Sequence, residues 1–243
     1  MRLKLFGYFL ALLIFSLGAS AEQAAGATTN ASYARTIYLI RHGAYDTQSP
    51  YDPDVSNGLV SLGIAQARLT AARLAGMPVT FDALIASNMK RARETAQVMN
   101  SSLPALKLQL SPLLRECFPK MADSERMQRM MKAGDAKAAD FDACEAQLKK
   151  AFQTYFVPAE DRERHDVLVC HGNVIRYLTL KAIGVDTGMW LNMSVAHTSL
   201  TVIRIAPNGT YKVLSVGDVG HLPPNMQSGV SGEDPQLVIP VGR

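Results

Sequence analysis

Two histidines stand beside glycine at the ends of apolar runs. Arg41-His42-Gly43 comes directly after Thr36–Ile40, and His171-Gly172 comes directly after Val167–Cys170. Short apolar runs of this kind predict strands buried on both faces of a parallel sheet. Such sheets bind ligands beyond the carboxyl ends of their strands. We therefore expect the two histidines and the arginine to face one crevice, where they could bind a small anion.

A second arginine and a carboxylate follow two further predicted strands. Arg91 is placed in the first turn of a helix from about Met89 to Asn100, after a strand at Asp82–Ala86. Glu116 follows a strand at Leu106–Leu110. The pattern thus brings Arg91 and Glu116 to the same edge of the sheet as the histidines.

The remaining pattern alternates strands with helices. Ser87 and Asn88 are candidates for the N-cap of the helix that carries Arg91. Strands alternating with helices predict an α/β three-layer sandwich with a mainly parallel sheet. Further helices are predicted at 62–74, 124–132, 136–156 and 173–183, and a closing hairpin at 200–205 and 211–216 around Pro207-Asn208-Gly209.

These segments together resemble the histidine phosphatase superfamily, also called the phosphoglycerate-mutase-like family, over about Thr36 to Pro224. Within it, the resemblance is greatest to the mitochondrial phosphoglycerate-mutase-like Ser/Thr-protein phosphatases. The matching blocks are Leu113-Leu114-Arg115-Glu116, Val169-Cys170-His171-Gly172-Asn173-Val174-Ile175-Arg176-Tyr177, and Pro207-Asn208-Gly209 with Gly217-Asp218-Val219-Gly220.

The resemblance implies a phosphatase that hydrolyses phosphate monoesters through a phosphohistidine. His42 would be the nucleophile, Glu116 the proton donor, and Arg41, His42, Arg91 and His171 the groups that bind the phosphoryl group. Backbone N–H groups after Gly172 would add to this anion site. Neighbouring guanidinium groups would keep His42 neutral, as a nucleophile must be. The arginines and histidines would stabilise the phosphoryl charge that Mg²⁺ stabilises in other enzymes, so we expect no metal and no cofactor.

Two residues are candidates for a supporting role. Gly43 adjoins the nucleophile, and His197 lies in Ala196-His197-Thr198-Ser199, where the protein phosphatases resemble Asn-Asn-Gly-Ser. His197 departs from that pattern, and its role is left open.

The N-terminus predicts export. Arg2 and Lys4 precede an apolar run from Leu5 to Gly18, and Ala19-Ser20-Ala21 follows, in the order of a secretory signal peptide. A periplasmic or secreted protein is expected, without stable membrane insertion once residues 1–21 are removed. The alternative is a membrane anchor formed by an uncleaved signal, although the run is shorter than the ~20 residues that span a bilayer.

The composition argues against nucleic acid as a partner. Loss of residues 1–21 leaves 23 basic against 21 acidic residues, a net charge of +2, and the rest of the chain contains no block of Lys and Arg. The expected partner is a phosphorylated small molecule or a phosphoprotein, and the oligomeric state is left open.

The predicted domain boundaries follow composition. Residues 22–34 are expected to form a leader, 35–222 the histidine phosphatase domain and 223–243 an extended C-terminal tail. Cys170 is expected to be a buried thiol, while Cys117 and Cys144 are left as a pair whose bonding the sequence does not decide.

Two other functions remain as alternatives. A mutase of the phosphoglycerate type shares the Arg-His-Gly motif, but Ala44-Tyr45-Asp46 replaces its usual continuation. A weakly active phosphopeptide-binding protein would keep the pocket without turnover.

Overall fold

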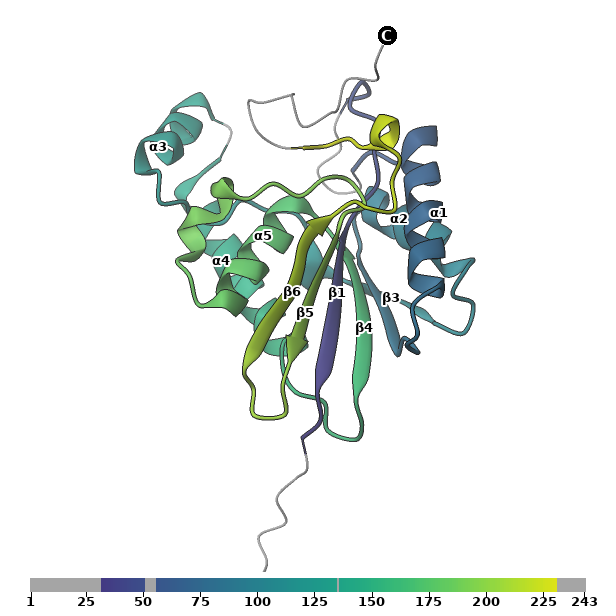
Figure 1. Cartoon of the computed structure of the whole chain (residues 1–243). Helices are drawn as coiled ribbons and strands as arrows, with labels where there is room; N and C mark the ends of the chain where they lie inside the picture. The colour runs from purple at the N-terminus through teal and green to yellow at the C-terminus, as the bar shows by residue number, and fades with distance from the viewer. Residues whose placement is uncertain (1–31, 51–55, 135, 231–243) are drawn as a thin grey trace, which may run out of the picture. The chain divides into compact units, whose positions relative to one another are not determined.

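A six-stranded sheet organises the computed structural model, which describes residues 32–50, 56–134 and 136–230 (Figure 1). The strand order is β3-β2-β4-β1-β5-β6. The first four strands in that order are parallel, and β5 and β6 are antiparallel additions at one edge. The strands are β1 (Arg35–Arg41), β2 (Ala83–Ser87), β3 (Leu108–Ser111), β4 (Arg164–Cys170), β5 (Leu200–Ile205) and β6 (Tyr211–Asp218).

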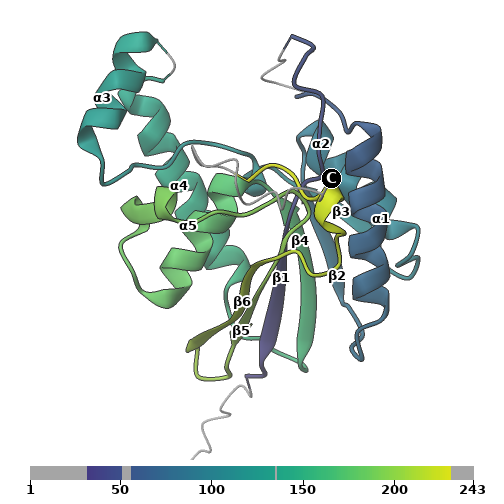
Figure 2. The same cartoon turned by 45° about the horizontal axis from the view of Figure 1, so that its top comes forward.

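Helices cover both faces of this sheet. In Figures 1 and 2, α1 and α2 lie on one face, and α4 and α5 lie on the other. The predicted three-layer α/β architecture with a mainly parallel sheet is confirmed. The helices are α1 (Ser61–Ala75), α2 (Lys90–Asn100), α3 (Ser124–Ala133), α4 (Ala138–Tyr155) and α5 (Gly172–Ile183), with short 3-10 turns at Pro112–Leu114, Thr187–Asn192 and Pro224–Met226.

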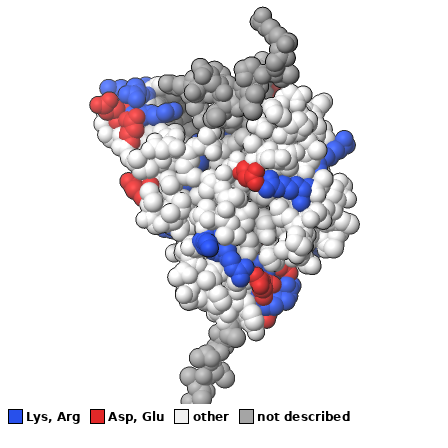
Figure 3. Space-filling model, in the orientation of Figure 1, with Lys and Arg blue, Asp and Glu red and all other residues white. Residues whose placement is uncertain are grey.

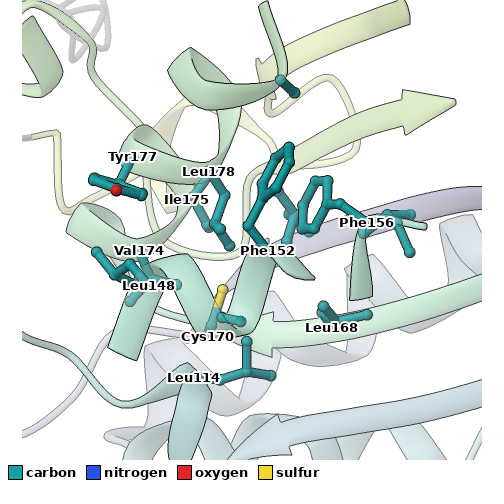
Figure 4. Packing of buried hydrophobic residues seen from close by; sticks show 14 of the residues in the cluster. Leu114, Leu148, Phe152, Phe156, Leu168, Cys170, Val174, Ile175, Tyr177 and Leu178 are labelled. Carbon is teal, nitrogen blue, oxygen red and sulfur yellow. The ribbon is translucent and has the colours of Figure 1, made fainter. Parts of the chain in front are cut away.

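Alternation along β1 divides its side chains between two cores. Ile37 and Leu39 pack in the cluster that includes α4 and α5, whereas Tyr38 and Ile40 pack in the cluster that includes α1 and α2. Successive strand residues point to opposite faces, so a strand covered on both sides must be apolar throughout. Figure 4 shows the first of these cores, where Phe152 and Phe156 of the α4 region pack near Leu168. These two cores fix the sheet against its helices, and so fix the ends of the strands.

The ends of the helices correct one expectation. Gly184 ends α5 as predicted, with a φ of 78° that suits glycine. The N-cap of α2, however, is Met89, and neither Ser87 nor Asn88 fills that position. Ser87 is the last residue of β2, and its hydroxyl is hydrogen-bonded to His171. Strand pairing of Ser87 with Ser111 thus extends β2 through the position that the local sequence assigned to the cap.

The predicted leader and tail extend partly into the described residues. Tyr33 forms a backbone bridge with Ala159, so the chain joins the fold just before β1. At the other end, Met226 and Ser228 accept hydrogen bonds from the side chain of Gln66 in α1. The stretch 223–230, assigned by composition to an extended tail, thus packs on the domain. The predicted signal peptide 1–21 and residues 22–31 and 231–243 lie outside the described residues.

The surface has mixed charge. On the face in Figure 3, basic and acidic side chains occur in small groups of both signs. The described residues form ion pairs such as Arg73 with Asp218 and Arg204 with Glu163. Within the described ranges, no helix is both long and apolar enough to cross a membrane.

Candidate active site

His42 follows β1 at the carboxyl edge of the sheet, as predicted. Its side chain is 2% exposed. Its Nδ1 lies 2.8 Å from the carbonyl oxygen of Gly43, which can only accept a hydrogen bond. Nδ1 therefore carries the proton, and Nε2 has the lone pair. Arg91 occupies that lone pair, because its Nε donates to His42 Nε2 at 3.0 Å.

His171 follows β4 and faces His42, with the two ring centroids 5.1 Å apart. Its Nε2 lies 2.8 Å from the hydroxyl oxygen of Ser87. That oxygen already accepts a hydrogen bond from the backbone N–H of Met89, at 3.3 Å. Among the described residues, His171 Nε2 is the acceptor within reach of the Ser87 hydroxyl proton, and this pairing leaves the proton of the imidazole on Nδ1.

Arg41 and Arg91 approach the histidines from β1 and α2. The Nη1 of Arg41 donates to the carbonyl oxygens of Val195 and Gly229, the first at 2.7 Å. Arg91 is 5% exposed, and its guanidinium carbon lies 4.8 Å from the centre of the Tyr45 ring. Burial lowers the pKa of Arg41 to about 10, so this arginine remains charged at neutral pH.

Glu116 lies beyond β3 and its 3-10 turn, and its Oε1 is fully enclosed. Burial raises the pKa of this carboxyl group, although Arg41 and Arg91 oppose the shift. The backbone N–H of Asn173 donates to the carboxylate. A proton donor at neutral pH requires a raised pKa of this kind.

A disulfide adjoins Glu116. Cys117 is bonded to Cys144 of α4, with the two Cα atoms 5.6 Å apart. The pairing that the sequence left open is thus formed in the structure, and it ties the segment of Glu116 to a helix of the core. Cys170 is a buried free thiol, as expected.

Five buried polar atoms of this site have no hydrogen-bond partner among the described residues. They are Arg41 Nε, Arg91 Nη1, His171 Nδ1, His197 Nε2 and Glu116 Oε1. Buried polar atoms are rarely left unpaired, and a cluster of them in one place indicates a site for a polar ligand. Four of the five belong to residues that can donate an N–H, which suits an anion.

The electrostatics of the site keep the histidines neutral. Burial is the largest cause that lowers the pKa of His42 well below 6.5, and the neighbouring His171 and Arg41 add to it. The pKa of His171 is lowered well below 6.5 by burial and then by Arg91 and Arg41. A neutral His42 with a lone pair on Nε2 is a competent nucleophile at physiological pH.

Two candidate glycines differ in what their positions require. A Cβ on Gly43 would lie 2.6 Å from the backbone oxygen of Gly63 at the start of α1. The loop after His42 can approach α1 only because this side chain is missing. A Cβ on Gly172 would meet Arg41 Nε at 3.6 Å, an ordinary contact, so Gly172 serves as the first residue of α5 without such a constraint.

Several residues of the site were missed at the level of sequence. Tyr45 packs edge-on against His42, with ring centroids 5.1 Å apart. Gln66 accepts a hydrogen bond from the backbone N–H of Ala44, and Thr95 accepts one from that of Gly43. Tyr45 lies two residues after Gly43, so its closeness to the Arg-His-Gly motif could have identified it as a residue of the site. Gln66 and Thr95 lie on helices and carry no motif.

His197 lies inside the site. Its ring centroid is 5.3 Å from that of His42, and the residue is 8% exposed. In the part of the chain that the structure describes, no group of three or more His, Cys, Asp or Glu residues is arranged to hold a metal ion.

Residues 37–218 match the histidine phosphatase superfamily (branch 1). The chain belongs to this superfamily. The resemblance inferred from Arg41-His42-Gly43 and its companion segments is confirmed.

Curated members of the histidine phosphatase superfamily extend this result. The chain is 32% identical over 194 residues to the mitochondrial serine/threonine-protein phosphatase PGAM5 of Mus musculus, covering 79% of this chain and 65% of the relative. It is 35% identical over 201 residues to the corresponding Caenorhabditis elegans protein, covering 80% and 66%. The chain thus spans just under two thirds of the length of these relatives. They support the prediction of a phosphatase.

Solved structures of the superfamily share the fold. The phosphoglycerate mutase of Bacillus anthracis superposes with a TM-score of 0.59 at 22% identity, covering 79% of this chain and 96% of the mutase. The α-ribazole phosphatase of Shigella flexneri superposes with a TM-score of 0.58 at 20% identity, covering 75% and 96%. At these identities the similarity establishes the fold and not the reaction.

The relatives correct the predicted location. Export to the periplasm or the medium is contradicted, because the similar superfamily members are mitochondrial proteins. The residues that suggested export, 1–21, lie outside the described part of the chain. A basic segment followed by an apolar run is defined only by its polarity and its length. This pattern does not by itself decide to which compartment a protein is delivered.

Proposed function

We propose that this protein is a phosphatase that hydrolyses phosphate monoesters through a phosphohistidine at Nε2 of His42. The observation that carries the proposal is the hydrogen bond from His42 Nδ1 to the carbonyl oxygen of Gly43. It places the lone pair on Nε2, beside the unpaired Nε of Arg41, Nη1 of Arg91 and Nδ1 of His171. A nucleophile surrounded by N–H donors is the arrangement that transfer of a phosphoryl group requires.

In the first step, His42 Nε2 attacks phosphorus and the bond between phosphorus and the ester oxygen breaks. The binding phosphoryl group takes over the N–H of Arg91 that donates to His42 Nε2 in the structure. Arg41, Arg91 and His171 donate to the nonbridging oxygens, whose charge is spread in the transition state. Glu116, with its raised pKa, gives its proton to the departing alkoxide, which leaves as an alcohol.

In the second step, water attacks the phosphorus of the phosphohistidine. The Glu116 carboxylate formed in the first step accepts a proton from that water, and the bond between phosphorus and His42 Nε2 breaks. Inorganic phosphate leaves, and both side chains return to their starting protonation states. One carboxyl group thus acts as acid and then as base.

A phosphorylated serine or threonine is the substrate class that the relatives favour, because they are named serine/threonine-protein phosphatases. Both alcohols are poor leaving groups that need a proton, and a buried carboxyl group with a raised pKa can supply it. The tethering of the Glu116 segment by the bond from Cys117 to Cys144 supports this role.

The test compares His42→Ala with His165→Ala on a generic aryl phosphate and on phosphoserine peptides. His165 is a matched control because it lies in β4, six residues before His171, and its ring is hydrogen-bonded to Tyr38. We expect His42→Ala to abolish hydrolysis and His165→Ala to retain it. Rapid quenching in alkali should trap phosphate on His42. Unchanged hydrolysis by His42→Ala, or phosphate on another residue, overturns the proposal.

A further inference from the structure

His197 is a third buried histidine beside the nucleophile, and the proposed mechanism does not use it. Its backbone N–H donates to the carbonyl oxygen of Ser228 at 2.8 Å, which anchors it to the C-terminal segment. Its ring lies near the rings of both His42 and Tyr45, with centroid distances of 5.3 and 6.1 Å. Its Nε2 is buried and has no partner among the described residues.

A chain of hydrogen bonds decides which nitrogen of His197 carries the proton. The backbone N–H of Ala44 donates to Gln66 Oε1, so the amide nitrogen of Gln66 is turned to the other side. That nitrogen donates to the hydroxyl oxygen of Ser228 at 2.9 Å. The Ser228 hydroxyl proton needs an acceptor, and His197 Nδ1, 3.0 Å away, is the one that the described residues offer to it. The proton of the imidazole is then on Nε2.

The same arrangement supports His171. In both cases a serine hydroxyl oxygen accepts one N–H and lies within hydrogen-bond distance of a ring nitrogen, Ser87 of His171 Nε2 and Ser228 of His197 Nδ1. In both cases the other ring nitrogen is buried and unpaired. His42 differs because it faces a carbonyl oxygen. One histidine is thus held as an acceptor and two are held as donors.

His197 is also held neutral. Burial, followed by the charges of Arg41 and Arg91, lowers its pKa to about 3. It therefore stays an uncharged N–H donor over the pH range in which such an enzyme works. A neutral donor stabilises charge on a phosphoryl oxygen without competing with Glu116 for protons.

We propose that His197 is a further phosphoryl-binding residue, whose Nε2–H donates to a nonbridging oxygen of the substrate phosphate beside the donors Arg41, Arg91 and His171. Ser228 and Gln66 act as positioning residues that hold this tautomer. The inference rests on the proposed function and adds to it a ligand at the same phosphate. It also gives the C-terminal segment a role in the site.

The test uses the full chain with three variants of His197. His197→Ala removes the donor, and we expect kcat/KM to fall about 100-fold, as for loss of one oxyanion donor. Inhibition by inorganic phosphate and orthovanadate should weaken in parallel. His197→Gln places an amide N–H near the position of Nε2 and should recover most of the loss. His197→Asn is too short to reach it and should behave like His197→Ala.

A direct measurement of the tautomer keeps the inference testable even if a variant folds poorly. Nitrogen-15 NMR of the wild-type ring should show the proton on Nε2, and Ser228→Ala should release that preference. A proton on Nδ1 overturns the inference. So does unchanged binding of phosphate by a folded His197→Ala.

The failures of the two proposals are distinguishable. If His42→Ala is inactive while His197→Ala binds phosphate and turns over like the wild type, only the role of His197 is lost. If His42→Ala remains active, the proposed function itself fails.

Discussion

The Nε of Arg91 lies 3.0 Å from the Nε2 of His42, so a guanidinium donor is hydrogen-bonded to the lone pair of the proposed nucleophile. The same cation helps to lower the pKa of His42. In the proposed mechanism, substrate phosphate must take this donor away before His42 can attack. The hydrogen bond therefore links binding of the anion to release of the nucleophile.

Replacing Arg91 by Lys tests that link. Lysine keeps the positive charge but lacks the planar fork that can turn from His42 to a phosphoryl oxygen. We expect kcat/KM to fall about 100-fold, the usual cost of one lost donor at a transition state. Arg93→Lys, two residues along α2 with a partly exposed side chain, is the control and should retain activity. Steady-state kinetics decide, and equal rates for both variants would contradict the link.

Glu116→Gln should distinguish leaving groups. An alkoxide needs a proton and a nitrophenolate does not, so we expect a loss of about 10²- to 10⁴-fold on phosphoserine and a much smaller loss on an aryl phosphate. Glu160→Gln, at an exposed position, should leave both rates unchanged. A similar loss on both substrates would assign Glu116 to binding instead of proton transfer.

The dependence of kcat/KM on pH should also reveal the role of Glu116 as proton donor. Because burial raises the pKa of Glu116, the acid form persists to a higher pH than for an ordinary glutamate. As pH rises through that pKa, kcat/KM for an alkyl phosphate should fall in the wild type, since the proton donor is lost. Glu116→Gln should lack this limb. Protonation of His42 should add no limb near 6.5, because its pKa lies well below that value.

Breaking the bond between Cys117 and Cys144 should lower the free energy of unfolding. The two cysteines are 27 residues apart, and cross-linking a loop of that length stabilises a fold by about 3 to 4 kcal/mol. Urea unfolding of the wild type with and without a reductant measures the effect. The double variant Cys117→Ser, Cys144→Ser should unfold as the reduced protein does and ignore the reductant. Identical midpoints in all four samples would show that the bond adds no stability.

Replacement by alanine should destabilise the protein at Gly43 but not at Gly172. The Cβ of Gly43→Ala would meet a backbone oxygen of Gly63 at 2.6 Å, and the overpacking should cost about 1 to 3 kcal/mol of unfolding free energy. Gly172→Ala makes only ordinary contacts and should not destabilise the protein. Thermal or urea unfolding of both variants checks the pair. Equal stability would mean that the loop after His42 can move away from α1.

Much of the fold was accessible from sequence because its strongest signals are local. The run before His42 is apolar throughout because β1 is covered on both faces, and the run before His171 is apolar for the same reason. The boundaries of the predicted strands and helices fall within a few residues of the observed ones. The predicted cap of α2 was wrong because Ser87 completes β2, where it pairs with Ser111 of β3, and α2 begins three residues later.

For the candidate active site too, the sequence determined some features and the tertiary structure decided others. Local order along the chain determined that His42, Arg91, Glu116 and His171 belong at one edge of a sheet, since the carboxyl ends of parallel strands meet there. The states of His171 and His197 depend on hydrogen-bond partners from distant segments, whereas His42 is paired with the carbonyl oxygen of the adjacent Gly43. Ser228 is 31 residues from His197, and Gln66 is 162 residues from Ser228. The sequence by itself thus determined which chemical groups meet. Only the tertiary structure decided where the protons of His171 and His197 lie, because hydrogen bonds between distant segments exist only once the chain has folded.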